Sequence, residues 1–244
     1  MLDEIQSQLA SLSNAEDAAF LQRFFKTGPG QYGEGDRFRG IRVPVLRRLS
    51  RAHQEIPLED AERLLHSAYH EDRLLALLIL VRKYANAAET SRTGIYSLYL
   101  NNTRFINNWD LVDASAEHIV GAFLSDKNRE PLYQLARSCS LWERRIAILA
   151  TFHFIKRGKV DETFRIAEML LTDKEDLIHK AVGWMLREAG KRDMQREEAF
   201  LSDHYQQMPR TMLRYAIEKF PQDKRLGYLK GTVSPGIHER MHLP

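Results

Sequence analysis

The residues best suited to chemistry lie in a short run near the middle of the chain, residues 107–113 (NNWDLVD). Trp109 and Asp113 are four residues apart, so on a helix they lie on one face. This spacing places a large aromatic surface beside a carboxylate, and arginine recurs at the matching place in later helices. An aromatic residue, an acid and a row of bases on one surface indicate a protein that handles a cationic or electron-poor group on a polyanion.

Both side chains also have ordinary structural explanations. A helix carboxylate is commonly exposed or paired with a neighbouring arginine, and a tryptophan is most often a core anchor. The polar Asn107 and Asn108 favour partial exposure of Trp109 at the start of a helix. A carboxylate that faces an anionic partner is repelled unless it has a task. Stabilising positive charge on a sugar, or holding water for attack on it, is such a task for Asp113.

The elements that position these residues form an internal repeat. Segments with a shared small residue align at Ala76, Ala147, Ala181 and Ala216, which are 71, 34 and 35 residues apart. The first gap is about two repeats, and its midpoint falls at Leu111. Helical periodicity runs almost throughout, with no convincing strand pattern. A period of about 35 residues predicts an all-α fold, an α-solenoid of HEAT-like antiparallel helix pairs.

The repeat also predicts a shared surface. Equivalent positions in a solenoid point the same way. The positions two residues before the aligned sites hold, in order, Leu74, Trp109, Arg145, His179 and Arg214. From the second repeat on, this is an aromatic residue followed by basic or potentially basic ones. We therefore expect a concave face that binds a polyanion, with nucleic acid as the first candidate.

The bases of this row are candidate phosphate contacts. Arg145 is the strongest, because a guanidinium matches phosphate geometry, although a salt bridge to Glu143 or to an acid of the next repeat explains it equally well. Lys180, Arg187 and Arg214 extend the row, and each alone also fits a solvated helix face.

Composition narrows the function classes. With 43% hydrophobic and 28% charged residues, the chain has the profile of an ordinary soluble globular protein. No apolar stretch reaches the roughly 18 residues of a membrane span, and the acidic N-terminus lacks the features of a secretory signal. We expect a cytoplasmic protein without membrane contact. A monomer is the simplest expectation, because an open groove needs no partner subunit.

Several kinds of active site are disfavoured. The single cysteine, Cys139, rules out an internal disulfide and a multi-cysteine zinc site. The nine histidines are scattered, without a His-Glu-x-x-His motif. Neither Ser-His-Asp nor Cys-His chemistry has a local signature. No metal and no cofactor are expected.

One segment breaks the helical pattern. Asn14 predicts the cap of a helix that runs through about Lys26, and residues 28–40 are rich in glycine. They lack the Gly-Lys-Ser/Thr ending of a phosphate-binding loop, so we expect a surface loop. Arg37 and Arg39 could touch a phosphate backbone, while a plain connector is the simpler interpretation. Residues 1–230 are expected to form a single HEAT-like domain, and residues 231–244 a C-terminal tail.

Four stretches carry a resemblance to a known family. They are residues 23–26 (RFFK) with Gly40 and Ile41 after the loop, residues 109–113 (WDLVD), residues 142–149 (WERRIAIL) and residues 180–188 (KAVGWMLRE). In this order and spacing the chain resembles the AlkD-type DNA alkylation repair proteins, which are bacterial HEAT-like-repeat DNA glycosylases. The resemblance covers the chain from Asn14 to about Lys230.

The resemblance implies a substrate, an activity and site residues. The substrate would be duplex DNA with N3- or N7-alkylated purines, and the activity that of a monofunctional glycosylase. Matched by motif, Trp109, Trp184 and Asp113 would contact the lesion nucleotide, Arg145 the DNA backbone, and Phe24 would be the early aromatic residue. The alkylated purine is already cationic and leaves without protonation. The enzyme must therefore stabilise an oxocarbenium-like sugar and place a water.

The chain departs from the family pattern in three places. Phe24 stands where tyrosine is familiar, Asn108 stands where a second aromatic residue is expected, and the glycine-rich loop is longer. These differences bear on lesion preference and rate.

Two other functions stay open. A non-catalytic solenoid that binds branched or distorted DNA would show the same basic row but tolerate loss of Asp113. A protein-binding HEAT scaffold would have an apolar or mixed face, and its binding would depend little on salt, whereas DNA binding weakens steeply with salt.

Overall fold

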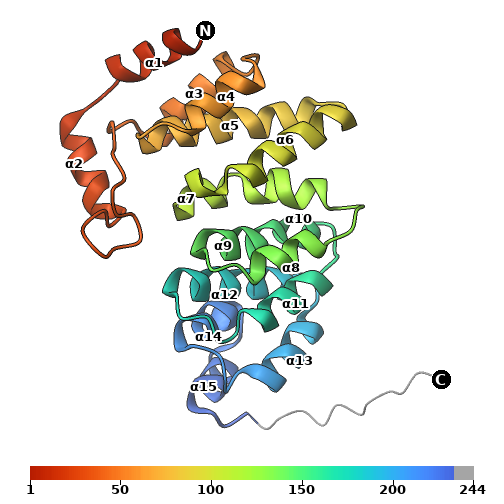
Figure 1. The fold of residues 1–244 in the computed structure, drawn as a ribbon. Coiled ribbons are helices and arrows are strands. Elements are labelled where there is room, and N and C mark those ends of the chain that lie inside the picture. The colour runs from red at the N-terminus through yellow and green to blue at the C-terminus, as the bar shows by residue number, and fades with distance from the viewer. Residues whose placement is uncertain (234–244) are drawn as a thin grey trace. The chain divides into compact units, whose positions relative to one another are not determined.

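The computed structural model describes residues 1–233 and is built from helices (Figure 1). In this part of the chain no strand forms, and the one β-type contact is an isolated bridge between Arg37 and Tyr69. The predicted all-α class is confirmed, and the helices pack mainly on their neighbours in the chain, as in an α-solenoid. Of the predicted C-terminal tail, residues 234–244 lie outside the described residues.

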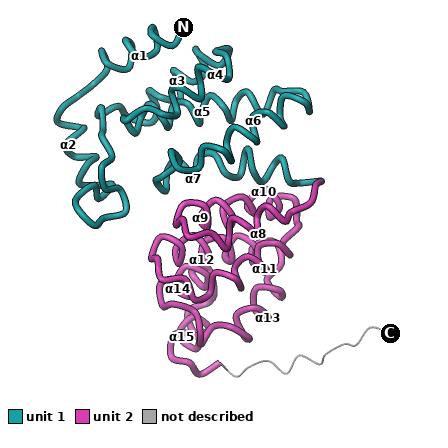
Figure 2. The backbone as a smooth tube through the Cα atoms, viewed as in Figure 1, with its two compact units in different colours: residues 1–126 teal, residues 127–244 magenta. Residues whose placement is uncertain are grey.

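The chain divides into two compact units, residues 1–126 and residues 127–244, where the sequence predicts a single domain over residues 1–230 (Figure 2). The elements of unit 1 are α1 (Leu2–Ser11), α2 (Ala15–Phe24), α3 (Val43–Ala52), α4 (Leu58–Leu65), α5 (His70–Asn86), α6 (Glu89–Asn101), the short turn η1 (Thr103–Phe105), α7 (Trp109–Asp113) and the π-helical turn η2 (Glu117–Gly121).

Helix α5 is the centre of unit 1, and α3, α4, α6, α7 and η2 all pack on it. Its middle is apolar on every side, and between Leu74 and Leu80 only Leu78 is even partly exposed. A helix that is hydrophobic all round has to be buried, so this sequence requires neighbours on each side. The predicted cap of the second helix is also confirmed, because the side chain of Asn14 accepts a hydrogen bond of 2.9 Å from the amide of Asp17.

Unit 2 repeats this arrangement around α12. Its elements are α8 (Glu130–Ala136), α9 (Leu141–Ala150), α10 (Phe152–Ile155), α11 (Asp161–Met169), α12 (Asp176–Gly190), α13 (Met194–His204), α14 (Arg210–Ala216), the turn η3 (Ile217–Lys219) and α15 (Gln222–Lys230). Helices α9, α10, α11, α13 and α14 pack on α12. None of the described helices is both long and apolar enough to span a bilayer.

The small residues that define the repeat lie at close helix contacts. Ala76, Ala147, Ala181 and Ala216 are at most 1% exposed, on α5, α9, α12 and α14. Two residues after Ala181, a Cβ built on Gly183 would lie 2.4 Å from the Met212 carbonyl oxygen. Helices α12 and α14 therefore approach so closely that only glycine fits at this position.

Candidate functional site

Trp109 and Asp113 line one hollow of unit 1, of about 430 Å³. Their predicted placement on one helix face is confirmed, and Phe24 lines the same hollow. Arg47 contributes the only base of the lining and Asp110 the second acid. The remaining lining residues are apolar: Leu21, Phe25, Val43, Leu74, Leu78 and Ala114. The hollow thus presents a carboxylate and aromatic surface next to a base.

The local sequence explains why α7 starts at Trp109. Asn108 is extended, with φ −151°, and its Oδ1 accepts a hydrogen bond of 2.9 Å from the amide of Trp109. The helix is only five residues long, so Trp109 is its first residue and Asp113 its last. The π-helical turn η2 follows shortly after, and such turns are frequent at functional sites.

Aromatic side chains support Trp109. Its ring stacks on Phe25, with centroids 5.3 Å apart and planes 23° from parallel. Phe24 approaches the same ring at 66°, with centroids 6.1 Å apart. Phe25 is buried and continues the stack to Phe38 at 5.1 Å, whereas Phe24 is 53% exposed. Trp109 is therefore held from behind, while Phe24 offers its surface to a ligand.

A buried charged network lies behind this aromatic stack. His70 Nδ1 is 3.0 Å from the carboxylate of Asp36, and its Nε2 is 2.8 Å from that of Asp110. Arg73 donates to Asp36 as well, and Asn108 donates to Asp36 at 3.3 Å. Burial alone would lower the pKa of His70, but Asp110 and Asp36 outweigh it and raise that pKa to about 9. His70 is thus an imidazolium at neutral pH, with both ring nitrogens donating.

The glycine-rich loop supplies Asp36 to this network, so its interpretation as a surface connector is wrong for Asp36, Phe38 and Gly40, which are buried. Asp36 and Phe38 are 7% and 6% exposed, and the ring of Phe38 stacks on His70 with centroids 4.6 Å apart. The amide of Gly40 donates to Glu71 at 2.8 Å. No feature of the sequence pairs Asp36 with His70, because the two lie 34 residues apart in segments without a common period.

The two arginines of the loop differ in their surroundings. Arg39 donates to Asp72 through Nε at 2.6 Å and Nη2 at 2.9 Å, and its guanidinium lies 3.9 Å from the Tyr69 ring centroid. Its side chain is 13% exposed, so Arg39 serves the scaffold and we do not carry it into a DNA interface. Arg37 is exposed and stays a predicted phosphate contact.

In unit 2, Arg145 of α9 is more buried than we expect of a residue that contacts DNA phosphates. The residue is 5% exposed, and its Nη1 donates to the carbonyl oxygen of Leu177 at 2.5 Å. This bond ties α9 to the first turn of α12. A role in DNA binding remains a prediction for Arg145, with this structural role beside it.

Trp184 lies on α12 between two bases. Lys180, Trp184 and Arg187 follow at spacings of four and three, so they share one helix face. Trp184 is half-buried, with Phe152 edge-on at 5.8 Å. Lys180 pairs with Asp176 at 2.7 Å, and Arg187 pairs with Glu218 and with Glu188, the latter at 3.3 Å.

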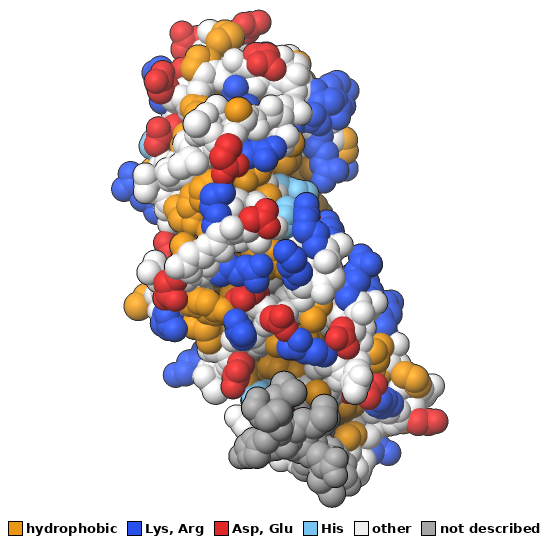
Figure 3. Space-filling model, turned by 90° about the vertical axis from the view of Figure 1, so that its right-hand side faces the viewer, with side chains coloured by type: hydrophobic (Ala, Val, Ile, Leu, Met, Phe, Trp, Pro, Cys, Tyr) orange, Lys and Arg blue, Asp and Glu red, His pale blue; other side chains and the backbone are white. Residues whose placement is uncertain are grey.

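Arg214, on α14, is exposed. On the face drawn in Figure 3, groups of lysine and arginine side chains have acids between them, so charge alone marks no single patch on this face. In residues 1–233 no group of three histidine, cysteine or acidic side chains is placed to hold a metal ion.

A family model described as DNA alkylation repair enzyme matches residues 5–220. The chain belongs to this family. Among solved structures, one described as a predicted DNA alkylation repair enzyme from Enterococcus faecalis is similar, with a TM-score of 0.66 and 18% identity. The match covers 86% of this chain and 97% of that one, and at this identity it shows a shared fold. No curated protein matches the chain.

The resemblance inferred from the four sequence stretches is therefore confirmed. The hollow of unit 1 presents an aromatic surface and a carboxylate, two kinds of group that attract a cation.

Proposed function

We propose that this family member is a monofunctional DNA glycosylase, which hydrolyses the N-glycosidic bond of N3- or N7-alkylated purines in duplex DNA. The observation that supports this most is the hollow in which Trp109 and Asp113 lie together with Phe24. A purely structural aspartate would not need an aromatic-lined hollow beside a base.

Hydrolysis of the bond to a cationic purine needs only a negative charge near the sugar and a water molecule. The alkylated purine is a cation, so when the bond between C1′ and the base nitrogen breaks, the electron pair leaves with a neutral base. Positive charge passes to the sugar, and Asp113 stabilises this oxocarbenium-like centre. Water then adds to C1′ and gives its proton to the carboxylate, which leaves an abasic site. No general acid is required.

The aromatic residues position the cation. Trp109 offers a π face that attracts positive charge, an interaction worth about 0.5 to 2 kcal/mol, and Phe25 keeps its ring in place. Phe24 adds exposed aromatic surface without a hydroxyl group. In unit 2, Trp184 stays a predicted contact to the lesion nucleotide, and Arg145, Lys180, Arg187 and Arg214 stay predicted phosphate contacts.

The test is release of 7-methylguanine or 3-methyladenine from a duplex with a single lesion. Asp113→Asn should lower single-turnover release by about 100-fold or more, because it removes the charge that stabilises the transition state. Its affinity for the duplex should stay within a few-fold of wild type. Asp126→Asn, an exposed aspartate of the same unit, is the matched control and should leave release unchanged.

The opposite result favours another function. If wild type releases neither base but still binds DNA in a salt-sensitive way, the non-catalytic DNA-binding protein is the better interpretation. The proposal also implies a cytoplasmic monomer that needs no metal or cofactor. Full activity in EDTA and a monomer mass by light scattering with and without DNA are the expected results.

A further inference from the structure

Unit 1 carries a group of bases without acidic partners close to the hollow. Helix α3 holds Arg47, Arg48 and Arg51 and no aspartate or glutamate. The last turns of α5 add Arg82 and Lys83. Within residues 1–233 none of the five forms an ion pair, while many other bases of the chain are neutralised by acids. Their charge is therefore available to a partner.

The spacing along two helices places three of these bases on one stripe with the hollow. On α3, Val43 and Arg47 line the hollow, and Arg51 lies one further turn along the same face. On α5, Leu74 and Leu78 line the hollow and are also four residues apart, so the next position in that series is Arg82. Arg51 on α3 and Arg82 on α5 thus each lie one helical turn beyond the residues that line the hollow.

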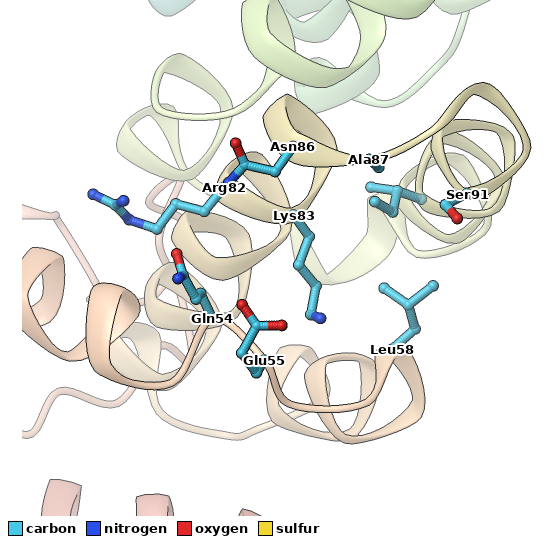
Figure 4. A pocket seen from close by; sticks show the side chains of 9 residues that line it. Gln54, Glu55, Leu58, Arg82, Lys83, Asn86, Ala87 and Ser91 are labelled. Atoms are coloured by element: carbon cyan, nitrogen blue, oxygen red, sulfur yellow. The ribbon is translucent and has the colours of Figure 1, made fainter.

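A direct bond joins the ends of the two stripes. Arg82 Nε donates to Ser50 Oγ of α3 at 3.1 Å, which fixes the guanidinium beside α3 and leaves its terminal amino groups for another acceptor. Figure 4 shows that the neighbouring side chains diverge. Both residues line a polar hollow of about 280 Å³, but the guanidinium of Arg82 points away from Glu55, whereas Lys83 extends toward Glu55.

We propose that Arg47, Arg51 and Arg82 form a phosphate-binding face for the DNA strand that carries the lesion. The proposal rests on the proposed function and extends it by a site on unit 1. A guanidinium binds phosphate through two parallel hydrogen bonds, which suits arginines without acidic partners. Because Arg47 also lines the hollow, it contacts the phosphate next to the lesion sugar. One helical turn of about 5.4 Å brings Arg51 and Arg82 to phosphates further along, since duplex DNA rises about 3.4 Å per nucleotide.

The chain offers a matched pair of double variants. Arg47→Gln/Arg82→Gln removes two charges from the face, and Arg48→Gln/Lys83→Gln removes two from adjacent positions that point elsewhere. Binding of an unmodified duplex is measured by fluorescence anisotropy over a salt series. Loss of two phosphate contacts should lower the slope of log affinity against log salt by about 1.8, and weaken binding about tenfold or more near physiological salt. The control should stay within about twofold of wild type.

Each outcome bears on the inference. Equal losses of affinity in both double variants mean that only net charge matters, and they overturn the proposed face. Unchanged binding by Arg47→Gln/Arg82→Gln also overturns it. So does DNA binding by wild type that does not depend on salt. Arg82→Lys keeps the charge and should retain most of the affinity for DNA. If Arg82 served only to bind Ser50, Arg82→Lys should lose as much affinity as Arg82→Gln. Base release by wild type is scored separately, so failure of the glycosylase proposal and failure of this face are distinguishable.

Discussion

Replacement of His70 by glutamine tests whether the buried network holds the proposed site together. In wild type, two carboxylates from different segments share one imidazolium, at 3.0 Å from Asp36 and 2.8 Å from Asp110. Glutamine cannot carry the charge. It leaves Asp36 with Arg73 and Asn108, and Asp110 with the backbone amide of Leu111. Removing one partner of a buried ion pair costs about 3 to 5 kcal/mol, so we expect a loss of this size in the stability of unit 1.

The same network makes stability depend on pH in a defined direction. The pKa of His70 is raised from 6.5 to about 9 in the folded state, so its stabilisation is fully present below pH 6.5 and declines as pH rises through 9. At 1.36 kcal/mol per pH unit this corresponds to a loss of about 3 kcal/mol over that window. His70→Gln should be less stable at pH 6.5 and should lack this decline.

Amide hydrogen exchange followed on peptides of α5 and α7 is the suitable assay, because it reports unit 1 separately. His118→Gln, the same substitution at an exposed histidine of η2, is the control. Base release by His70→Gln should fall mainly in kcat, because α7 is displaced while the phosphate contacts remain. Equal opening free energies for wild type and His70→Gln at pH 6.5, or no decline in wild type toward pH 9.5, would refute the charged network.

Two further substitutions test the packing of unit 2. Glu197 is 1% exposed, its Oε1 has no hydrogen-bond partner, and burial raises its pKa from 4.5 to about 8, so it costs stability as pH rises between these values. Glu197→Gln should therefore raise the free energy of unfolding, measured in urea, by about 5 kcal/mol at most at pH 8.5, and change it little at pH 4.5. An equal effect at both pH values would argue against this ionisation. Gly183→Ala should lower Tm by several degrees, through overpacking that costs about 1 to 3 kcal/mol, because its Cβ would meet the Met212 carbonyl at 2.4 Å and Tyr215 Cβ at 2.5 Å. Gly94→Ala, in open space on α6, is the control and should raise Tm slightly.

The features that sequence predicted correctly rest on local periodicity. Trp109 and Asp113 share a face because the helix repeat alone places residues four apart side by side. The aligned alanines are buried because each repeat must pack its inner helix closely on the next.

The features that sequence missed depend on contacts between distant segments. Phe25, the residue after the predicted Phe24, stacks on Trp109, and only the direction of α2 decides which of the two is buried. Arg39 donates to Asp72, and Arg145 donates to the carbonyl oxygen of Leu177. The sequence shows neither contact and treats both arginines as candidate phosphate contacts. Composition cannot separate an arginine neutralised by an acid from one without an acidic partner, so the sequence does not distinguish Arg47 and Arg82 from the other arginines.

Asn108 and the glycine-rich loop, two of the places where the sequence predicts departures from the family pattern, contact each other in this chain. A helix of five residues is too short to hold its position by its own hydrogen bonds. Asn108 is fully buried, and its amide binds on both sides, with Oδ1 capping Trp109 and Nδ2 donating to Asp36 of the loop. An aromatic side chain at position 108 could do neither. The loop thus fixes the start of α7, and with it the direction in which Trp109 and Asp113 face the hollow.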